Sequence, residues 1–439
     1  MPVSGFHRAL RTVLAQRCPH ALLLACLLLA CLLPALPVAA QQADAPAPGA
    51  DVASIRSWLL THNPELRARQ AEAEAAQAQA IAAGSLPNPV AGISLQGISP
   101  RHPSLLPANV GNTLYQLRQP IPLWGKRGLQ RSIAERNALA TGAEREATAL
   151  TLLAQAEAAY VRYWHAGQAL KLLDGQLLLL RQLEDIAGVR YALGMAPQQD
   201  AIRAQVETSR VQGLRIAQEA SGHESGMLLN LLLGRPAEAA LLEPAAVPML
   251  PVASTRLGDA LTRLDKGTHP ALQAAQAQVE AAQDSLRLRQ RDRWPDISVG
   301  IGAMQRGHRI DGFDLMLEVE LPLQRRALHA REREAQRLED AAQARAEGLH
   351  TTLGGQLGVA WTQWRSAQRQ RQLLETTRIP QAEANFQSAL ASYQVGDVDF
   401  NALLDALTDW QDARLAQLDA QRDELIGAAN VRALEGDTP

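Results

Sequence analysis

Four sequence landmarks occur twice along this chain of 439 residues, in the same order and about 200 residues apart. In chain order the pairs are His62-Asn63-Pro64 with His269-Pro270, Leu86-Pro87-Asn88-Pro89 with Trp294-Pro295-Asp296, Ile121-Pro122-Leu123 with Leu321-Pro322-Leu323, and Tyr191 to Gly194 with Tyr393 to Gly396. Chance rarely preserves four ordered matches at so similar an offset. The pattern therefore predicts two tandem copies of one structural unit.

The repeat boundaries follow from these landmarks and from a proline-rich joint between the copies. The joint covers residues 233–255 and contains Pro236, Pro244, Pro248 and Pro251, which favour an extended linker. We assign the first repeat to residues 53–232 and the second to residues 256–433. An N-terminal segment at 41–52 and a C-terminal tail at 434–439 complete the mature chain.

Each repeat changes its hydrophobic periodicity in the same order. A first helix opens at the Asn-Pro or His-Pro landmark and runs to about Ala83 or Arg293, because proline suits the first position of a helix. Alternating residues then predict β-hairpins at 90–122 and 296–322. A long helix and a returning helix complete each copy.

The hairpin of the second repeat separates an apolar face from an acidic one. The residues expected on the apolar, lipid-facing side are Ile297, Val299, Ile301, Phe313, Leu315, Leu317, Val319 and Leu321, whereas Asp314, Glu318 and Glu320 are expected to face a water-filled lumen. Strands of about 10 residues can cross a bilayer in a tilted barrel. Four strands cannot close even the smallest barrel of about eight, so the chain should oligomerise. Taken alone, the strands also fit a soluble β-layer with one wet face.

The helical stretches that follow the hairpins are unusually long, from Leu123 to about Gly188 and from Leu323 to about Leu390. Roughly 65 residues at about 1.5 Å each extend close to 100 Å, several times the length of an ordinary globular helix. Ile133, Ala140 and Ala147 are spaced by seven residues, which is typical of helices in close mutual contact. Pro380 is expected to break or restart the second long helix.

The first 40 residues read as an export signal. Basic residues precede an apolar run from Ala21 to Leu33, and the small residues that end at Ala40 suit cleavage there. All three cysteines lie in this segment, so conventional cleavage leaves no thiol. Leu28-Leu29-Ala30-Cys31 also loosely matches a lipoprotein site, which leaves lipidation of Cys31 as an alternative. A retained membrane anchor is a second alternative, although the run is short for a spanning helix.

Composition argues against several other functions. A net charge of -2 offers no basic surface for nucleic acid, so we expect no nucleic-acid partner. Histidines are scattered and methionine is sparse, so we predict no bound metal and no other cofactor. The chain has no glycine-rich phosphate loop, nucleophile elbow or paired-carboxylate motif, which predicts a protein that is not an enzyme.

The ordered landmarks closely resemble those of the TolC-like outer membrane factor family, over about residues 52 to 433. The resemblance rests on Leu86 to Pro89, Gln119 to Pro122, Gly125 to Arg127 and Tyr191 to Gly194. It implies a mainly α fold, with duplicated helical hairpins in a periplasmic barrel and four membrane strands per chain in a twelve-stranded β-barrel shared by a homotrimer. It further implies an outer-membrane location and partners that comprise a periplasmic adaptor and an inner-membrane pump, of RND type. The Gly-Lys-Arg form is similar to that of the CusC- and CzcC-type metal-efflux branch.

The resemblance also implies that acidic side chains narrow the periplasmic entrance. By position, Asp405 matches one such aspartate, whereas Ala402 stands where the best-studied type has another. Asp397, Asp399 and, in the first half, Asp200 are further candidates. Three copies of an aspartate around one axis would concentrate negative potential. The alternative is an ordinary helix N-terminus, where aspartate is favoured by the helix dipole.

Tyr191, Gly194, Tyr393 and Gly396 mark the expected tips of the two helical hairpins. Glycine can adopt the left-handed conformation that ends one helix and turns into the next. The resemblance implies adaptor docking at these tips, and both roles are compatible.

The predicted function is that of an outer-membrane channel subunit in a tripartite system that exports small molecules or metal ions. Two alternatives stay open. One is a type I-like channel for protein secretion, and the other is a periplasmic coiled-coil protein that never crosses a membrane. In such assemblies the pump, and not the outer-membrane channel, usually selects the cargo.

Overall fold

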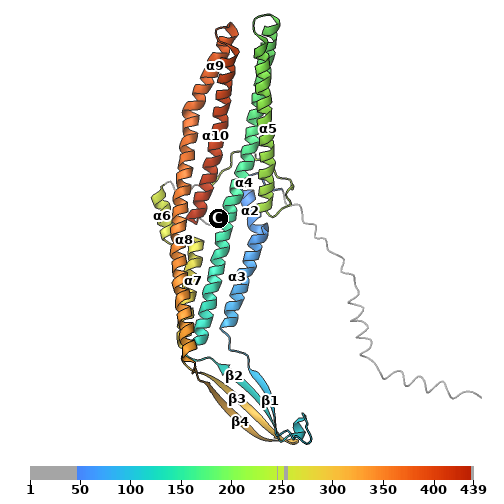
Figure 1. The fold of residues 1–439 in the computed structure, drawn as a ribbon, viewed down its shortest axis with the longest axis vertical. Helices are drawn as coiled ribbons and strands as arrows, with labels where there is room; N and C mark the ends of the chain where they lie inside the picture. The colour runs from blue at the N-terminus through green and yellow to red at the C-terminus, as the bar shows by residue number, and fades with distance from the viewer. Residues whose placement is uncertain (1–46, 245, 252–255, 437–439) are drawn as a thin grey trace, which may run out of the picture. The chain divides into compact units, whose positions relative to one another are not determined.

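The computed structural model describes residues 47–244, 246–251 and 256–436 (Figure 1). The expected export signal, with Cys31, lies outside the described residues. From Pro48 onward the described residues form one unit. No helix of the described residues is both long enough and apolar enough to cross a membrane.

The expected order of helices and strands is confirmed in both repeats. In the first repeat the elements are α2 (Val52–His62), α3 (Pro64–Ala83), β1 (Val90–Gln96), η1 (Pro107–Asn109), β2 (Asn112–Ile121), α4 (Lys126–Ala192) and α5 (Gln198–Leu232). In the second they are α6 (Leu257–Asp265), α7 (Pro270–Arg291), β3 (Asp296–Arg306), β4 (Arg309–Glu320), α8 (Arg325–Leu373), η2 (Leu374–Arg378), α9 (Ile379–Val395) and α10 (Phe400–Glu435). The short helices α2 and α6 were not expected from the sequence, and β1, with 7 residues, is shorter than expected.

The first landmark of each repeat connects the start of α3 or α7 to the end of the last helix of that repeat. Asn63 caps α3 by accepting from the Leu66 amide at 3.0 Å, and its amide group donates to the Leu232 carbonyl at the end of α5. His269 does the same for α7, since Nδ1 accepts from the Ala271 amide while Nε2 lies 3.3 Å from the Ala433 carbonyl. Both residues are buried. The landmark is therefore a joint between α3 and α5 in the first repeat and between α7 and α10 in the second.

A glycine completes each of these joints. Gly234 and Gly436 have positive φ angles of 70° and 76° just beyond the last helix of each repeat. A Cβ atom on Gly234 would lie 2.6 Å from Pro64 Cδ, and one on Gly436 would lie 2.9 Å from His269 Cα. Only glycine allows both this backbone conformation and this close approach.

The longest helix, α4, has 67 residues and therefore extends about 100 Å. Its part nearer the strands packs against α3 and α7, and its part further from the strands packs against α5 and α10. Alanines are frequent among its buried residues, and small side chains allow such close neighbours. The core is therefore a series of clusters along the helices, the largest of which lies near the α5 and α10 starts.

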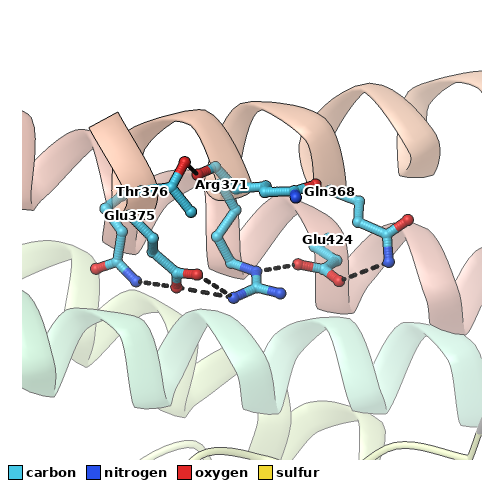
Figure 2. Close-up of polar contacts among 7 residues, drawn as sticks. Gln368, Arg371, Glu375, Thr376 and Glu424 are labelled. Atoms are coloured by element: carbon cyan, nitrogen blue, oxygen red, sulfur yellow. Dashed lines mark hydrogen bonds and ion pairs between the residues drawn. The ribbon is translucent and has the colours of Figure 1, made fainter. Parts of the chain in front are cut away.

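The second long helical stretch is interrupted as predicted at Pro380. Proline lacks the amide that would continue the α-helical ladder, and the five residues of η2 before it form a π-helix. Figure 2 shows how this turn is held against α10. Arg371 binds both Glu424 of α10 and Glu375 of η2, and Gln417 donates to Glu375 at 3.0 Å. The irregular turn is thus fixed by charge-assisted contacts.

The two repeats meet through α4 with α7 and also through α4 with α10. Glu157 of α4 is buried between Arg432 of α10, at 2.5 Å, and Arg56 of α2, at 3.6 Å. Further along the same pair, His165 Nε2 lies 2.8 Å from Asp419. Burying a carboxylate in this way is tolerable only because cationic partners compensate it.

The four strands form one antiparallel sheet in the order β1-β2-β3-β4. The hairpins of the two repeats are joined side by side through β2 and β3, with Tyr115 opposite Ala303. Strands β1 and β4 lie at the edges, and neither has a second strand partner within the sheet. Both edges therefore present backbone groups that a further strand can pair.

We expect Gly427→Ala to destabilise the protein. A Cβ atom on this α10 glycine would lie 2.9 Å from Trp364 Cβ and 3.0 Å from its Cα on α8, so the helices would have to separate. Overpacking of this kind costs about 1–3 kcal/mol. Thermal unfolding of the purified protein measures the loss. The control is Gly348→Ala on α8, which meets no neighbour and should gain up to about 1 kcal/mol.

Candidate functional site

The apolar residues predicted for one side of the hairpin lie on one face of the sheet. The register pairs Ile297 with Val319, Val299 with Leu317, Ile301 with Leu315 and Ala303 with Phe313. The first repeat continues the same face, because Leu117 lies opposite Ile301 and Ala91 lies opposite Leu117. Leu321 falls just after β4 and is exposed.

This apolar face is open to the surroundings. Phe313 and Leu315 are 83% and 82% exposed, and Leu317 is 67% exposed. A continuous row of large apolar side chains at such exposure is unfavourable in water. The face therefore needs an apolar environment.

The opposite face of the sheet is polar. Arg118 of β2 reaches across β3 to Glu318 of β4, with a distance of 2.7 Å between Nη1 and Oε2. Gly300, which lies between Arg118 and Met316 in the register, leaves room for this bridge because it has no side chain. Asp314 and Glu320 share this face by strand alternation.

The two helical hairpin tips have the same backbone turn. Gly194 and Gly396 have φ angles of 72° and 90°. After α4 the Met195 amide donates to the Arg190 carbonyl at 2.8 Å, and after α9 the Asp397 amide donates to the Ser392 carbonyl at 2.9 Å. These are matching Schellman-type ends, so glycine sets the turn in both copies.

The two landmark tyrosines have different environments. Tyr191 is 49% exposed, whereas Tyr393 is buried against Phe400 with a centroid distance of 5.6 Å. The guanidinium of Arg190 lies 4.5 Å from the Tyr393 ring centroid and donates to the Tyr393 carbonyl at 2.6 Å. The Tyr393 hydroxyl is buried and makes no hydrogen bond within the described residues. Arg190 thus connects the two tips, a role that no motif in the sequence indicates.

The four candidate aspartates divide into two groups. Asp399 caps α10 by accepting from the Ala402 amide at 2.8 Å, which is the helix-end role given as the alternative above. Asp200 lies in the first turn of α5 and is half-buried. Asp397, Asp399 and Asp405 are exposed. Of the four, Asp200 is therefore the least accessible to solvent or a partner.

The carboxylates of Asp200 and Asp399, which belong to different repeats, interact electrostatically. Burial raises the pKa of the Asp200 carboxyl, and the negative charge of Asp399 raises it further. Arg203 and Arg190 oppose this rise. Arg203 also binds Asn401 of α10. The tips are thus coupled by charges from both copies. Among the described residues, no group of three or more His, Cys, Asp or Glu side chains could hold a metal ion.

Comparison with known proteins identifies the family. The model of the outer membrane efflux protein family matches residues 55–235 and 265–437, which is most of the chain and falls once on each repeat. The chain belongs to the outer membrane efflux protein family. No match is found among curated protein sequences. Channels of this family are trimers that work with adaptor and pump partners.

Solved structures share the fold. The outer-membrane channel OprN is 20% identical, with a TM-score of 0.75 over 88% of this chain and 89% of that one. VceC from Vibrio cholerae is also 20% identical, with a TM-score of 0.75 over 88% and 96%. CusC is 17% identical, with a TM-score of 0.74 over 88% and 92%. The family membership makes this chain an outer membrane protein, and its long helices form the periplasmic portion.

We predict that the α4–α5 tip becomes more stable as the pH falls into the carboxylate range. Since the pKa of Asp200 is raised in the folded protein, its stabilising effect is complete when it is protonated and is lost as the pH rises through that pKa. Hydrogen exchange of amides around Gly194, corrected for intrinsic rates, measures the opening. Asp200→Asn should abolish the pH dependence. Asp397→Asn should preserve it, because Asp397 is exposed.

Proposed function

We propose that three copies of this chain form an outer-membrane channel that exports small molecules or metal ions. The observation that carries the proposal is the four-stranded sheet with two open edges and one exposed apolar face. In lipid, unpaired backbone groups are too costly to persist, so membrane strands must close into a ring. Three sheets of four strands would close a twelve-stranded barrel.

The two faces of the sheet suit opposite sides of such a barrel. The row from Ile297 to Leu317 and the neighbouring Phe313 supply an apolar outer surface, and Leu321 continues it beyond β4. The Arg118–Glu318 bridge, with Asp314 and Glu320, then lines a water-filled lumen. Strand lengths of 10 to 12 residues in β2, β3 and β4 fit the thickness that tilted membrane strands must cross.

The long helices extend the same conduit away from the sheet. With α4 about 100 Å long, the hairpin tips lie far from the strands, at the other end of the chain's periplasmic portion. Tyr191 and Gly194, with Gly396 of the second tip, are exposed there and provide a surface for a periplasmic adaptor. An inner-membrane pump of RND type would then deliver the exported molecule through that adaptor.

The proposed entrance is lined by Asp405, with Asp397 nearby. Asp405 is exposed on α10, and the three copies in a trimer would bring like charges around the channel axis. Such a ring favours cations and repels anions. Asp399 is already engaged as a cap, so we give it a structural part.

We expect Leu315→Arg to block assembly in the outer membrane, whereas Met316→Arg should be tolerated. The residues are adjacent on β4 but point to opposite faces. An arginine near the middle of a lipid-facing strand costs about 2–4 kcal/mol. The yield of trimer extracted from the outer-membrane fraction measures the difference. Equal yields would mean that the face with Leu315 does not touch lipid, as in a soluble scaffold.

We expect Asp405→Ala to raise single-channel conductance or to weaken block by divalent cations. Removing three charges from the axis lowers the negative potential at the entrance, which weakens divalent block. The smaller alanine side chains also widen the proposed entrance, which raises conductance. Planar bilayer recordings of the purified trimer measure both effects. Asp423→Ala, which removes an exposed charge about 27 Å further along α10 and beyond the screening length of about 10 Å, is the control and should leave the currents unchanged. Unchanged currents in both variants would make Asp405 an ordinary surface residue.

A further inference from the structure

Four arginines lie at or near the starts of the two long helices that follow the strands. Arg325 and Arg326 are the first residues of α8, Arg331 follows less than two turns later, and Arg127 is the second residue of α4. The first three lie within about 9 Å along the α8 axis, because a helix rises about 1.5 Å per residue. All four are exposed. We call them the junction arginines.

The strands and helices are closely connected at this junction. Only four residues separate β4 from α8, and the Arg325 amide donates to the Leu323 carbonyl at 2.9 Å. The α4 start is tied to the start of β3, since Lys126 binds Asp296 at 2.9 Å and the carbonyl of the nearby Trp294 at 2.9 Å. The junction arginines therefore lie directly beside the proposed membrane strands.

The junction arginines differ from neighbouring basic residues, because no acidic side chain of the described residues pairs with them. Other basic residues here have partners, such as Arg289 with Asp292 at 3.2 Å and Arg293 with Glu332 at 4.0 Å. In the part of the chain that the structure describes, none of the junction arginines makes an ion pair or a side-chain hydrogen bond. Neither α4 nor α8 has an acidic residue in its first turn. Positive charge at a helix start also opposes the helix dipole, so these arginines do not stabilise their own helices.

The neighbouring side chains are those expected at a membrane–water interface. Trp124 and Trp294 pack with ring centroids 5.0 Å apart, and both are about half exposed. Leu323, between the sheet and α8, is 80% exposed. Tryptophan is enriched at the level of lipid headgroups, where its ring is partly apolar and partly polar. The exposed apolar face of the sheet is thus followed by tryptophans and then by arginines.

We propose that the junction arginines bind the phosphate groups of anionic phospholipids in the periplasmic leaflet of the outer membrane. This inference rests on the proposed membrane position of the sheet. The charge complementarity is direct, because a guanidinium donates two parallel hydrogen bonds to phosphate oxygens. Binding of this kind would hold the barrel at a fixed depth in the membrane, with the long helices projecting from the headgroup layer.

The test compares lipid binding of the full-length trimer in detergent. Native mass spectrometry counts bound phosphatidylglycerol, with phosphatidylcholine as the uncharged comparison. A variant with R325Q, R326Q and R331Q should bind phosphatidylglycerol at least tenfold more weakly, since each arginine near an anionic surface contributes roughly fivefold. The control removes three exposed arginines far along the same helical stretch, R345Q, R369Q and R378Q, and should bind as the wild type does.

A second measurement needs no variant. Retention of phosphatidylglycerol by the wild type should fall as salt is raised, whereas retention of phosphatidylcholine should not. Equal binding of the two lipids by the wild type, or equal phosphatidylglycerol binding by wild type and R325Q/R326Q/R331Q, would overturn the inference. A variant that keeps its lipid binding but changes its ion selectivity in phosphatidylcholine bilayers would also overturn the inference. The arginines would then face the lumen.

The same preparations separate this inference from the proposed function. If wild-type trimers conduct in phosphatidylcholine bilayers but show no preference for phosphatidylglycerol, only the proposed lipid site is rejected. If the wild-type protein forms neither trimers nor channels, the proposed channel function is rejected.

Discussion

The backbone groups on the two edges of the sheet are the constraint on which the rest of the architecture depends. Among the residues that the structure describes, β1 and β4 each have a strand on one side only. Their outer amides and carbonyls must be paired wherever water is absent. One chain cannot bend four strands into a closed ring, so the unit that satisfies its own hydrogen bonds is the oligomer. The exposed apolar face strengthens this requirement, because it favours a lipid environment in which no water can pair these backbone groups.

The helical portion has a different requirement, because helices about 100 Å long must be stabilised along their whole length without one central core. Along α4 the buried positions are mostly alanine and leucine, with successive clusters instead of one centre. Each level of the bundle is stabilised by its own neighbours. The polar contacts Glu157–Arg432 and His165–Asp419 then join the two repeats, and directional contacts of this kind help to set the register of long, similar helices.

Much of this fold could be predicted from the sequence because its periodic signals are long. Sixty-seven residues of one helix, and strands that alternate strictly, leave few competing interpretations. The short α6 was missed because its 9 residues follow a proline-rich joint and carry no capping side chain. Its counterpart α2 does have an Asp51 cap, which is the signal that would have revealed it.

The candidate site was less predictable, since it depends on contacts between distant segments. The sequence presents Tyr191 and Tyr393 as equivalents, yet only Tyr393 is buried, because Phe400 and Arg190 cover it. Likewise, the spacing of Asp200 and Asp399 does not reveal that their charges interact across the repeats. The alternation in β4, by contrast, was enough to separate its two faces, because a strand has only two.

The joints made by Asn63 with Gly234 and by His269 with Gly436 have an evolutionary consequence. Each copy is fastened at its own base, so an insertion or loss in one hairpin need not be matched in its sister. The two repeats differ accordingly in their arms, because α4 is unbroken whereas the second long helical stretch is interrupted by the π-helix η2 and its tip encloses Tyr393. Both differences lie away from the joints.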